Sequence, residues 1–212
     1  MLPSRYAQGV LRRSLLASAA FALAMTGVSA AQARSVIKQP GAHPRYELEL
    51  EPHLLIAWDQ PGWRNDEGFG PGVRLTIPIV EQGPIKKINN SMAIGFGADW
   101  ALYDDECGAG DCSASTFYFP AVLQWNFWLT DVVSVFGEPG FGIRYTTWDN
   151  DGWDDCPYNR NDWRCQYYDG DNNDLDFVFI FQAGGRFMFS DTIGAVARIG
   201  YPYVSGGVTF LF

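Results

Sequence analysis

The chain is poor in charged residues, in histidine and in cysteine. Of its 212 residues, 18% are Asp, Glu, Lys or Arg, and 24 acidic residues outnumber 15 basic ones. Nucleic-acid binding requires clustered Lys and Arg to neutralise phosphates, so we expect no nucleic-acid partner. The two histidines and four cysteines, without a Cys-x-x-Cys spacing, argue against a zinc site.

Long apolar runs are also scarce. One run, from Leu15 to Val28, follows three arginines and precedes small-residue cleavage motifs that end at Ala30 and Ala33. It is shorter than the roughly 20 apolar residues of a membrane-spanning helix, and its flanks are typical of a secretory signal peptide. We therefore predict a signal peptide over residues 1–33, a periplasmic N-terminal linker over 34–45, and one domain over 46–212.

Aromatic residues (16%) and glycine (23 residues) are abundant, which is unlike the composition of disordered chains. From Tyr46 to Trp58 apolar and polar residues alternate, and this period of two indicates a β-strand. The alternation recurs seven more times, so the sequence predicts eight strands. The charged strand residues fall on the face opposite the apolar one: Glu47, Glu49, Glu51, Arg74, Asp99, Glu138, Arg144, Asp176, Arg186 and Arg198.

Two architectures produce strands of this kind. A soluble barrel buries its apolar face, whereas a transmembrane barrel turns that face to lipid and encloses the polar one. The aromatic content, the segment lengths and the glycines beside the charges favour the second. We predict an all-β fold, an eight-stranded antiparallel transmembrane up-and-down β-barrel, in which the enclosed charges form a lumen ion-pair network.

The lengths of the connections support a barrel whose N-terminus lies in the periplasm, because outer-membrane barrels have long outer loops and short periplasmic turns. The predicted outer connections are 59–67, 104–114, 148–173 and a tight turn at Pro202. The predicted periplasmic connections are 81–91, 130–132 and 190–192.

Four prolines fall within the predicted strands, where each one removes a backbone donor from the ladder. We expect some of them to mark strand ends or bulges. The alternation continues unchanged after the first of them, which argues against a simple one-residue bulge there. The four are Pro52, Pro78, Pro120 and Pro139.

The last eight residues, Ser-Gly-Gly-Val-Thr-Phe-Leu-Phe, resemble the terminal signature of Gram-negative outer-membrane barrels. The whole predicted domain is similar in plan to the small eight-stranded group that includes OmpX, OmpW and the OmpA transmembrane domain. The resemblance implies a place in the outer membrane among lipid and lipopolysaccharide. It also implies recognition by the barrel-assembly machinery, through Gly207, Phe210 and Phe212.

The four cysteines fall in the predicted outer loops as two close pairs. An even count in an exported protein favours disulfides, and local pairing is our prediction, although three connectivities exist. The two local pairs are Cys107 with Cys112 and Cys156 with Cys165.

The third outer loop is acidic and aromatic. Exposed aromatic side chains can bind an extracellular glycan or protein ligand, and anchoring in the membrane interface is the competing interpretation. The candidates are Trp148, Trp153, Trp163 and Tyr167. Clustered carboxylates suggest a Ca²⁺ site, although the loop lacks the Gly and Glu of a complete calcium loop, and a solvated acidic loop is the alternative. The candidate ligands are Asp149, Asp151, Asp154, Asp169 and Asp171.

Catalysis is not predicted, and no catalytic residue is proposed. His53 is the one strand histidine and is predicted to face inward near Glu51, where a structural role fits better than a catalytic one. An eight-stranded barrel leaves an interior that side chains can fill. We therefore predict a plugged lumen and a structural or surface-interaction role, with a narrow channel for small or hydrophobic solutes as the alternative.

Overall fold

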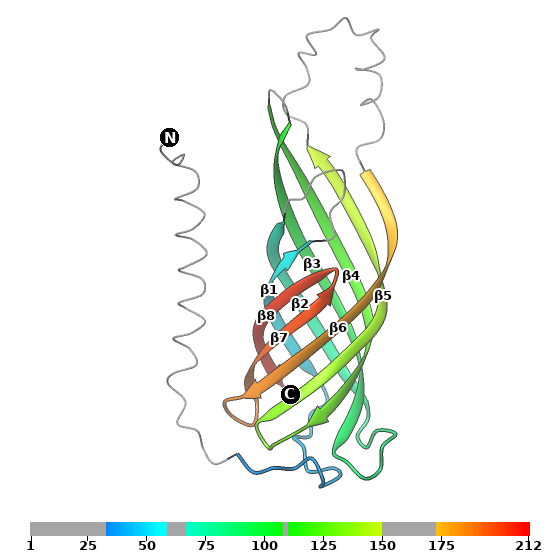
Figure 1. Cartoon of the computed structure of the whole chain (residues 1–212), viewed down its shortest axis with the longest axis vertical. Coiled ribbons are helices and arrows are strands. Elements are labelled where there is room, and N and C mark those ends of the chain that lie inside the picture. Colours follow the sequence, from blue (N-terminus) through cyan, green and yellow to red (C-terminus); the bar gives the residue numbers. More distant parts are fainter. Residues whose placement is uncertain (1–32, 59–66, 108–109, 150–172) are drawn as a thin grey trace, which may run out of the picture. The chain divides into compact units, whose positions relative to one another are not determined.

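Eight antiparallel strands close into a barrel in which each strand pairs with its sequence neighbours and the first pairs with the last (Figure 1). The computed structural model describes residues 33–58, 67–107, 110–149 and 173–212, without the side chains of 104–113 and 148–149. The up-and-down topology predicted from the alternation is confirmed. The strands are β1 (Glu49–Ala57), β2 (Gly68–Val80), β3 (Asn90–Cys107), β4 (Gly110–Trp128), β5 (Val133–Asp149), β6 (Asn173–Met188), β7 (Ile193–Tyr201) and β8 (Tyr203–Leu211).

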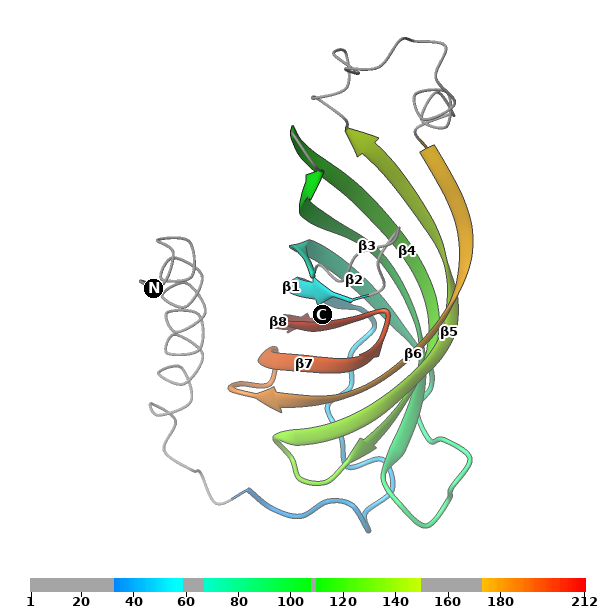
Figure 2. The same ribbon diagram turned by 45° about the horizontal axis from the view of Figure 1, so that its top comes forward.

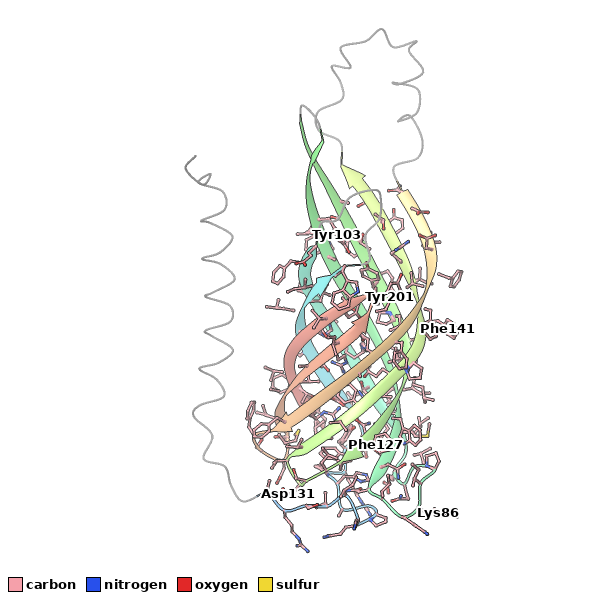
Figure 3. The ribbon with its side chains drawn as sticks, in the orientation of Figure 1. Lys86, Tyr103, Phe127, Asp131, Phe141 and Tyr201 are labelled. Atoms are coloured by element: carbon pink, nitrogen blue, oxygen red, sulfur yellow. The ribbon has the colours of Figure 1, made fainter. Side chains whose placement is uncertain are left out.

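The two faces of the strands differ as a transmembrane barrel requires. Large apolar side chains such as Leu54, Phe96 and Phe179 are exposed on the outer face, while charged side chains are buried inside. Phe141 likewise projects outward from the barrel wall (Figure 3). An apolar belt around a polar interior is the arrangement of a barrel in lipid, because water would penalise that belt. Within the described part of the chain, no helix is long and apolar enough to span a bilayer.

The barrel wall is uneven at its outer end. Strands β3, β4, β5 and β6 continue beyond the hairpin that joins β7 to β8 (Figures 1 and 2). The prediction of a loop over 104–114 is wrong, because the β3–β4 ladder continues to the pair formed by Cys107 and Gly110. Polar residues beyond the apolar belt can extend a ladder as readily as apolar ones, since backbone groups make its hydrogen bonds.

The prolines within the strands interrupt individual ladders without breaking the barrel. The β1–β8 ladder lacks the pair at Pro52 and resumes in the same register. Similar gaps occur at Pro120 in the β3–β4 ladder and at Pro139 in the β4–β5 ladder. Only Pro78 accompanies a register shift, which lies between Pro78 and Val80. A proline, which lacks the backbone N–H, therefore removes a few ladder pairs with one neighbouring strand. The alternation of inward and outward side chains continues past it.

Residues 34–45, here called the N-terminal strap, lie against the periplasmic end of the barrel. Val36 is buried there in an apolar cluster with Trp128, Met188 and Leu211. The segment predicted as a linker is thus an ordered part of the barrel end, which its polar composition did not indicate.

Candidate functional site

The barrel interior holds most of the charged residues that the alternation assigned to it. Glu51 faces Arg74 across the β1–β2 ladder, so both project inward at neighbouring levels. Because no bulk water solvates them there, buried charges must be paired to be tolerated. The pairing that results links strands on opposite sides of the barrel.

Glu138 on β5 is the centre of this network. Its Oε2 accepts hydrogen bonds from Arg74 Nη1 at 3.1 Å and from Arg198 Nε at 2.9 Å. Its Oε1 accepts a bond from Gln124 Nε2 at 2.6 Å. Arg198 Nη1 in turn pairs with Glu51. Side chains from β1, β2, β4 and β7 therefore bond to Glu138 or to its partner Arg198. These bonds cross-link the strands in a region of low dielectric constant, where electrostatic interactions are strong.

A second branch of the network runs toward the outer end. Arg74 Nη2 donates to the Tyr203 hydroxyl at 2.9 Å, and that hydroxyl donates to Asp99. His53 lies between two carboxylates, with Nε2 3.0 Å from Asp99 Oδ1 and Nδ1 3.4 Å from Glu51 Oε1. Among the described residues, the lumen buries four carboxylates and three guanidinium groups. The imidazole of His53 is buried with them.

A separate ion pair lies on the periplasmic side of the lumen. Arg186 Nη2 lies 2.6 Å from Glu49 Oε2, and Thr209 Oγ1 donates to the same carboxylate at 2.7 Å. The guanidinium also lies over the Trp128 ring, 5.8 Å from its centroid. Tyr46 precedes β1 beside this pair, and burial raises the pKa of its phenol to about 12.

Two predicted network members stand apart, and one does not belong to it. Arg144 Nη2 lies 2.6 Å from Asp176 Oδ2, but this pair is near the outer end, where the Asp176 side chain is 40% exposed. The assignment of Glu47 to the lumen is wrong, since Glu47 precedes β1 and is exposed. Its N–H donates to the Phe212 carbonyl at 2.7 Å, so the chain there joins the barrel rim and does not enter the interior.

The lumen also contains an apolar cluster, which begins beside the charged residues and extends toward the outer end. The side chains there are mostly small or aliphatic, together with three tyrosines, and all are buried. This outer lumen cluster consists of Leu55, Ala57, Ala101, Tyr103, Ala114, Tyr118, Val122, Val178, Ile180 and Tyr203.

Glycines make room for the network. A Cβ on Gly72 would lie 2.3 Å from Asp99 Oδ1 and 2.4 Å from His53 Nε2. A Cβ on Gly97 would lie 3.0 Å from Arg74 Nε. The glycines that accompany the charges in the sequence therefore supply the space in which long charged side chains cross the barrel.

The terminal residues singled out by the resemblance complete the barrel closure. Phe212 N donates to the Leu48 carbonyl at 2.8 Å, and the Phe212 side chain is exposed on the outer face. Phe210 pairs with Leu50. A Cβ on Gly207 would lie 2.6 Å from His53 Cβ, so this glycine has a packing reason of its own.

The remaining predicted sites lie outside the described residues. These are the side chains of all four cysteines, the loop aromatics Trp148, Trp153, Trp163 and Tyr167, and the five aspartates of the calcium hypothesis. Among the described residues, no group of three or more His, Cys, Asp or Glu side chains is placed to hold a metal ion.

Comparison with known proteins places the fold. No family model matches the sequence, and no curated protein matches it. The structure of Neisserial surface protein A is similar with a TM-score of 0.51 at 12% identity, covering 78% of this chain and 97% of that one. The fold is that of the small outer-membrane β-barrels.

A second solved structure is that of Ail, the attachment invasion locus protein of Yersinia pestis, in complex with the heparin analogue sucrose octasulfate. Its TM-score is 0.46 at 10% identity, covering 78% of this chain and 96% of that one. The apolar belt of the barrel described here is the surface that a barrel in lipid presents.

Several lumen residues of this outer-membrane barrel were missed from the sequence. Tyr203, Gln124 and Thr209 all project inward and bond to the charged groups. The alternation predicts that all three project inward. They carry no charge, however, and charge was the signal that marked the candidate residues.

Proposed function

We propose that this protein is a closed outer-membrane barrel with a structural or surface-interaction role. The observation that supports it is the set of side-chain bonds across the lumen. Ion pairs and hydrogen bonds around Glu138, Arg198 and Arg74 involve every strand except β6. Gln182 on β6 joins them by donating to the Tyr203 carbonyl at 3.2 Å.

A solute that crossed the barrel would have to separate these pairs. Breaking one buried pair costs about 3–5 kcal/mol, because a charge is left uncompensated. An ion on the axis could replace part of that loss, but the pairs are arranged in successive levels, from Glu49 and Arg186 to Asp99 and Tyr203. We therefore propose that no solute is transported through the lumen.

The surface role is assigned to the third outer segment, 148–173. It contains seven aspartates and two arginines beside its aromatic residues. Its net negative charge repels anionic ligands, among them sulfated glycans such as the heparin analogue in the Ail structure. The partner we propose is therefore a neutral glycan or a basic protein. Aromatic side chains stack on sugar rings, and such stacking does not require a charged ligand.

Glycan-array binding by the purified barrel tests this role. We expect signals on neutral glycans that are lost in the combined Trp153→Ala and Trp163→Ala variant, while Phe141→Ala, a change on the lipid-facing wall, has no effect. Binding restricted to sulfated glycans, or unchanged in the loop variant, would contradict the assignment.

The C-terminal residues are the part of the chain to which we assign a role in assembly. We propose that the barrel-assembly machinery recognises Phe210 and Phe212, and that the finished barrel contacts lipopolysaccharide through the outer part of its apolar belt. The exposure of the Phe212 side chain supports this, because an exposed ring is available for recognition.

The alternative is a narrow channel for small or hydrophobic solutes. The outer lumen cluster favours it, since its small apolar side chains could line an entrance for such a solute. Uptake of a fluorescent alkane derivative into proteoliposomes distinguishes the two functions: Ala101→Trp should reduce uptake by a channel and change nothing in a closed barrel.

A further inference from the structure

The N-terminal strap is bound by backbone hydrogen bonds to the periplasmic connections of the barrel. Val36 N donates to the Leu129 carbonyl at 3.1 Å, and Asn89 N donates to the Ile37 carbonyl at 2.8 Å. The Val36 side chain is only 4% exposed. These bonds join the strap to two different connections, the one after β4 and the one before β3.

His43 adds a side-chain contact at the other end of the strap. Its Nδ1 lies 2.7 Å from Asn89 Oδ1, and its ring stacks on Trp128 with 6.0 Å between centroids. Trp128 also lies under Arg186 of the lumen. The strap therefore covers the periplasmic side of the Glu49–Arg186 pair.

The first residue of the strap is held from two directions. Arg34 N donates to Asp131 Oδ1 at 3.1 Å, and Asp131 N donates to the Arg34 carbonyl at 3.2 Å. Ser35 forms a β-bridge with Thr130 beside it. Asp131 lies at the periplasmic tip of the barrel, in the turn between β4 and β5 (Figure 3).

We propose that a leader peptidase hydrolyses the Ala33–Arg34 bond and that the new α-ammonium group of Arg34 forms an ion pair with Asp131, locking the strap over the periplasmic mouth. Hydrolysis adds water across the peptide bond, leaving a carboxylate on Ala33 and an amine on Arg34 that is protonated. An α-amino group with an ordinary pKa of about 8 carries this proton at neutral pH. The proposal does not depend on whether the lumen conducts.

Of the two cleavage motifs, only this one would place the new charge on the nitrogen that faces Asp131. The nitrogen that would become charged already donates to the Asp131 carboxylate, so processing strengthens an existing bond without rearrangement. A cut after Ala30 would leave three residues before Arg34, which place the ammonium group up to about 10 Å farther along the chain.

The first test is the mass of the protein purified from outer membranes. We expect a chain that begins at Arg34. A chain that begins at Ala31, or one that retains the leader, would overturn the proposal.

The second test measures strap opening by hydrogen exchange at the amides of Val36 and Asn89, in refolded chains that begin at Arg34 or at Ala31. An exposed ion pair changes such an equilibrium by about two- to fivefold. Asp131→Asn should raise both exchange rates by that factor in the Arg34 chain only, and the difference between the chains should vanish above about pH 9. Asp191→Asn, an exposed acid in the β6–β7 turn, is the matched control and should change neither rate.

Equal effects of Asp131→Asn in the two chains would mean that the ammonium group plays no part, even if the terminus is at Arg34. Exchange at amides of the central strands should stay constant throughout, which separates strap opening from unfolding of the barrel.

Discussion

Replacing Arg198 by Met should destabilise the barrel more than replacing Glu138 by Met. Arg198 bonds to Glu138 through Nε at 2.9 Å and through Nη2 at 3.3 Å, and it is the arginine partner of Glu51. Without it, four buried carboxylates face two guanidinium groups. Without Glu138, three carboxylates face three guanidinium groups, and the buried charge is closer to balance.

The magnitudes follow from the cost of an uncompensated buried charge, about 3–5 kcal/mol. We expect Arg198→Met near the upper end of that range and Glu138→Met near the lower end, because Arg74 keeps Tyr203 and Asp99 as neighbours. The double variant should lose less than the sum of the two single losses, since it removes both partners of one pair.

Equilibrium unfolding in urea, with the barrel in lipid vesicles, measures these losses through tryptophan fluorescence and through the mobility difference between boiled and unboiled samples. Exposed Lys86→Ala, in the β2–β3 connection, is the control and should leave the unfolding free energy unchanged. A loss below about 1 kcal/mol for Arg198→Met, or strictly additive losses, would refute the reasoning.

Other predictions follow from single contacts. Gly72→Val should disrupt the lumen, because its Cβ would meet Asp99 and His53; far-ultraviolet circular dichroism after refolding should show a poor yield, whereas Gly137→Ala, with open space at its Cβ, should refold normally. Phe212→Ala should slow assembly in cells, scored as outer-membrane protein per cell, yet leave refolding in vitro intact because the ring is exposed. Burial raises the pKa of Tyr46 to about 12, so its contribution to stability is present below pH 10 and is lost as pH rises through 12; Tyr46→Phe should abolish this part of the alkaline decline in unfolding free energy. If the third outer segment binds Ca²⁺, isothermal titration with millimolar calcium should release or absorb heat, and no heat would remove that hypothesis.

The fold was predictable from the sequence because lipid and lumen impose opposite chemistry on alternate residues. Eight alternating segments fixed the strand number, and the inward position of Glu51, Arg74 and Glu138 followed from parity. The partners did not follow. Glu51 faces Arg74 in the ladder, yet its carboxylate pairs with Arg198 on β7. Long side chains reach across the lumen, and the sequence alone does not give the register in which the barrel closes.

The errors have similar physical causes. Glu47 continues the alternation but lies before β1, and parity alone does not say where a strand begins. The strap is polar and short of strand signals, so its docking through backbone groups and one buried valine was not predicted. The reach of β3 and β4 past the apolar belt was hidden by the polar residues near Cys107.

Single-channel conductance of the refolded protein in a planar bilayer tests the central claim, that the lumen is closed by paired charges. The account predicts no conductance steps for the native chain. It also predicts that the double variant of Arg198 and Glu138 shows no steps, because the Glu49–Arg186 pair still spans the periplasmic side of the lumen. Reproducible cation-preferring steps from the native protein, altered by Arg74→Ala or Glu138→Ala, would contradict the closed lumen and make the interior a pathway.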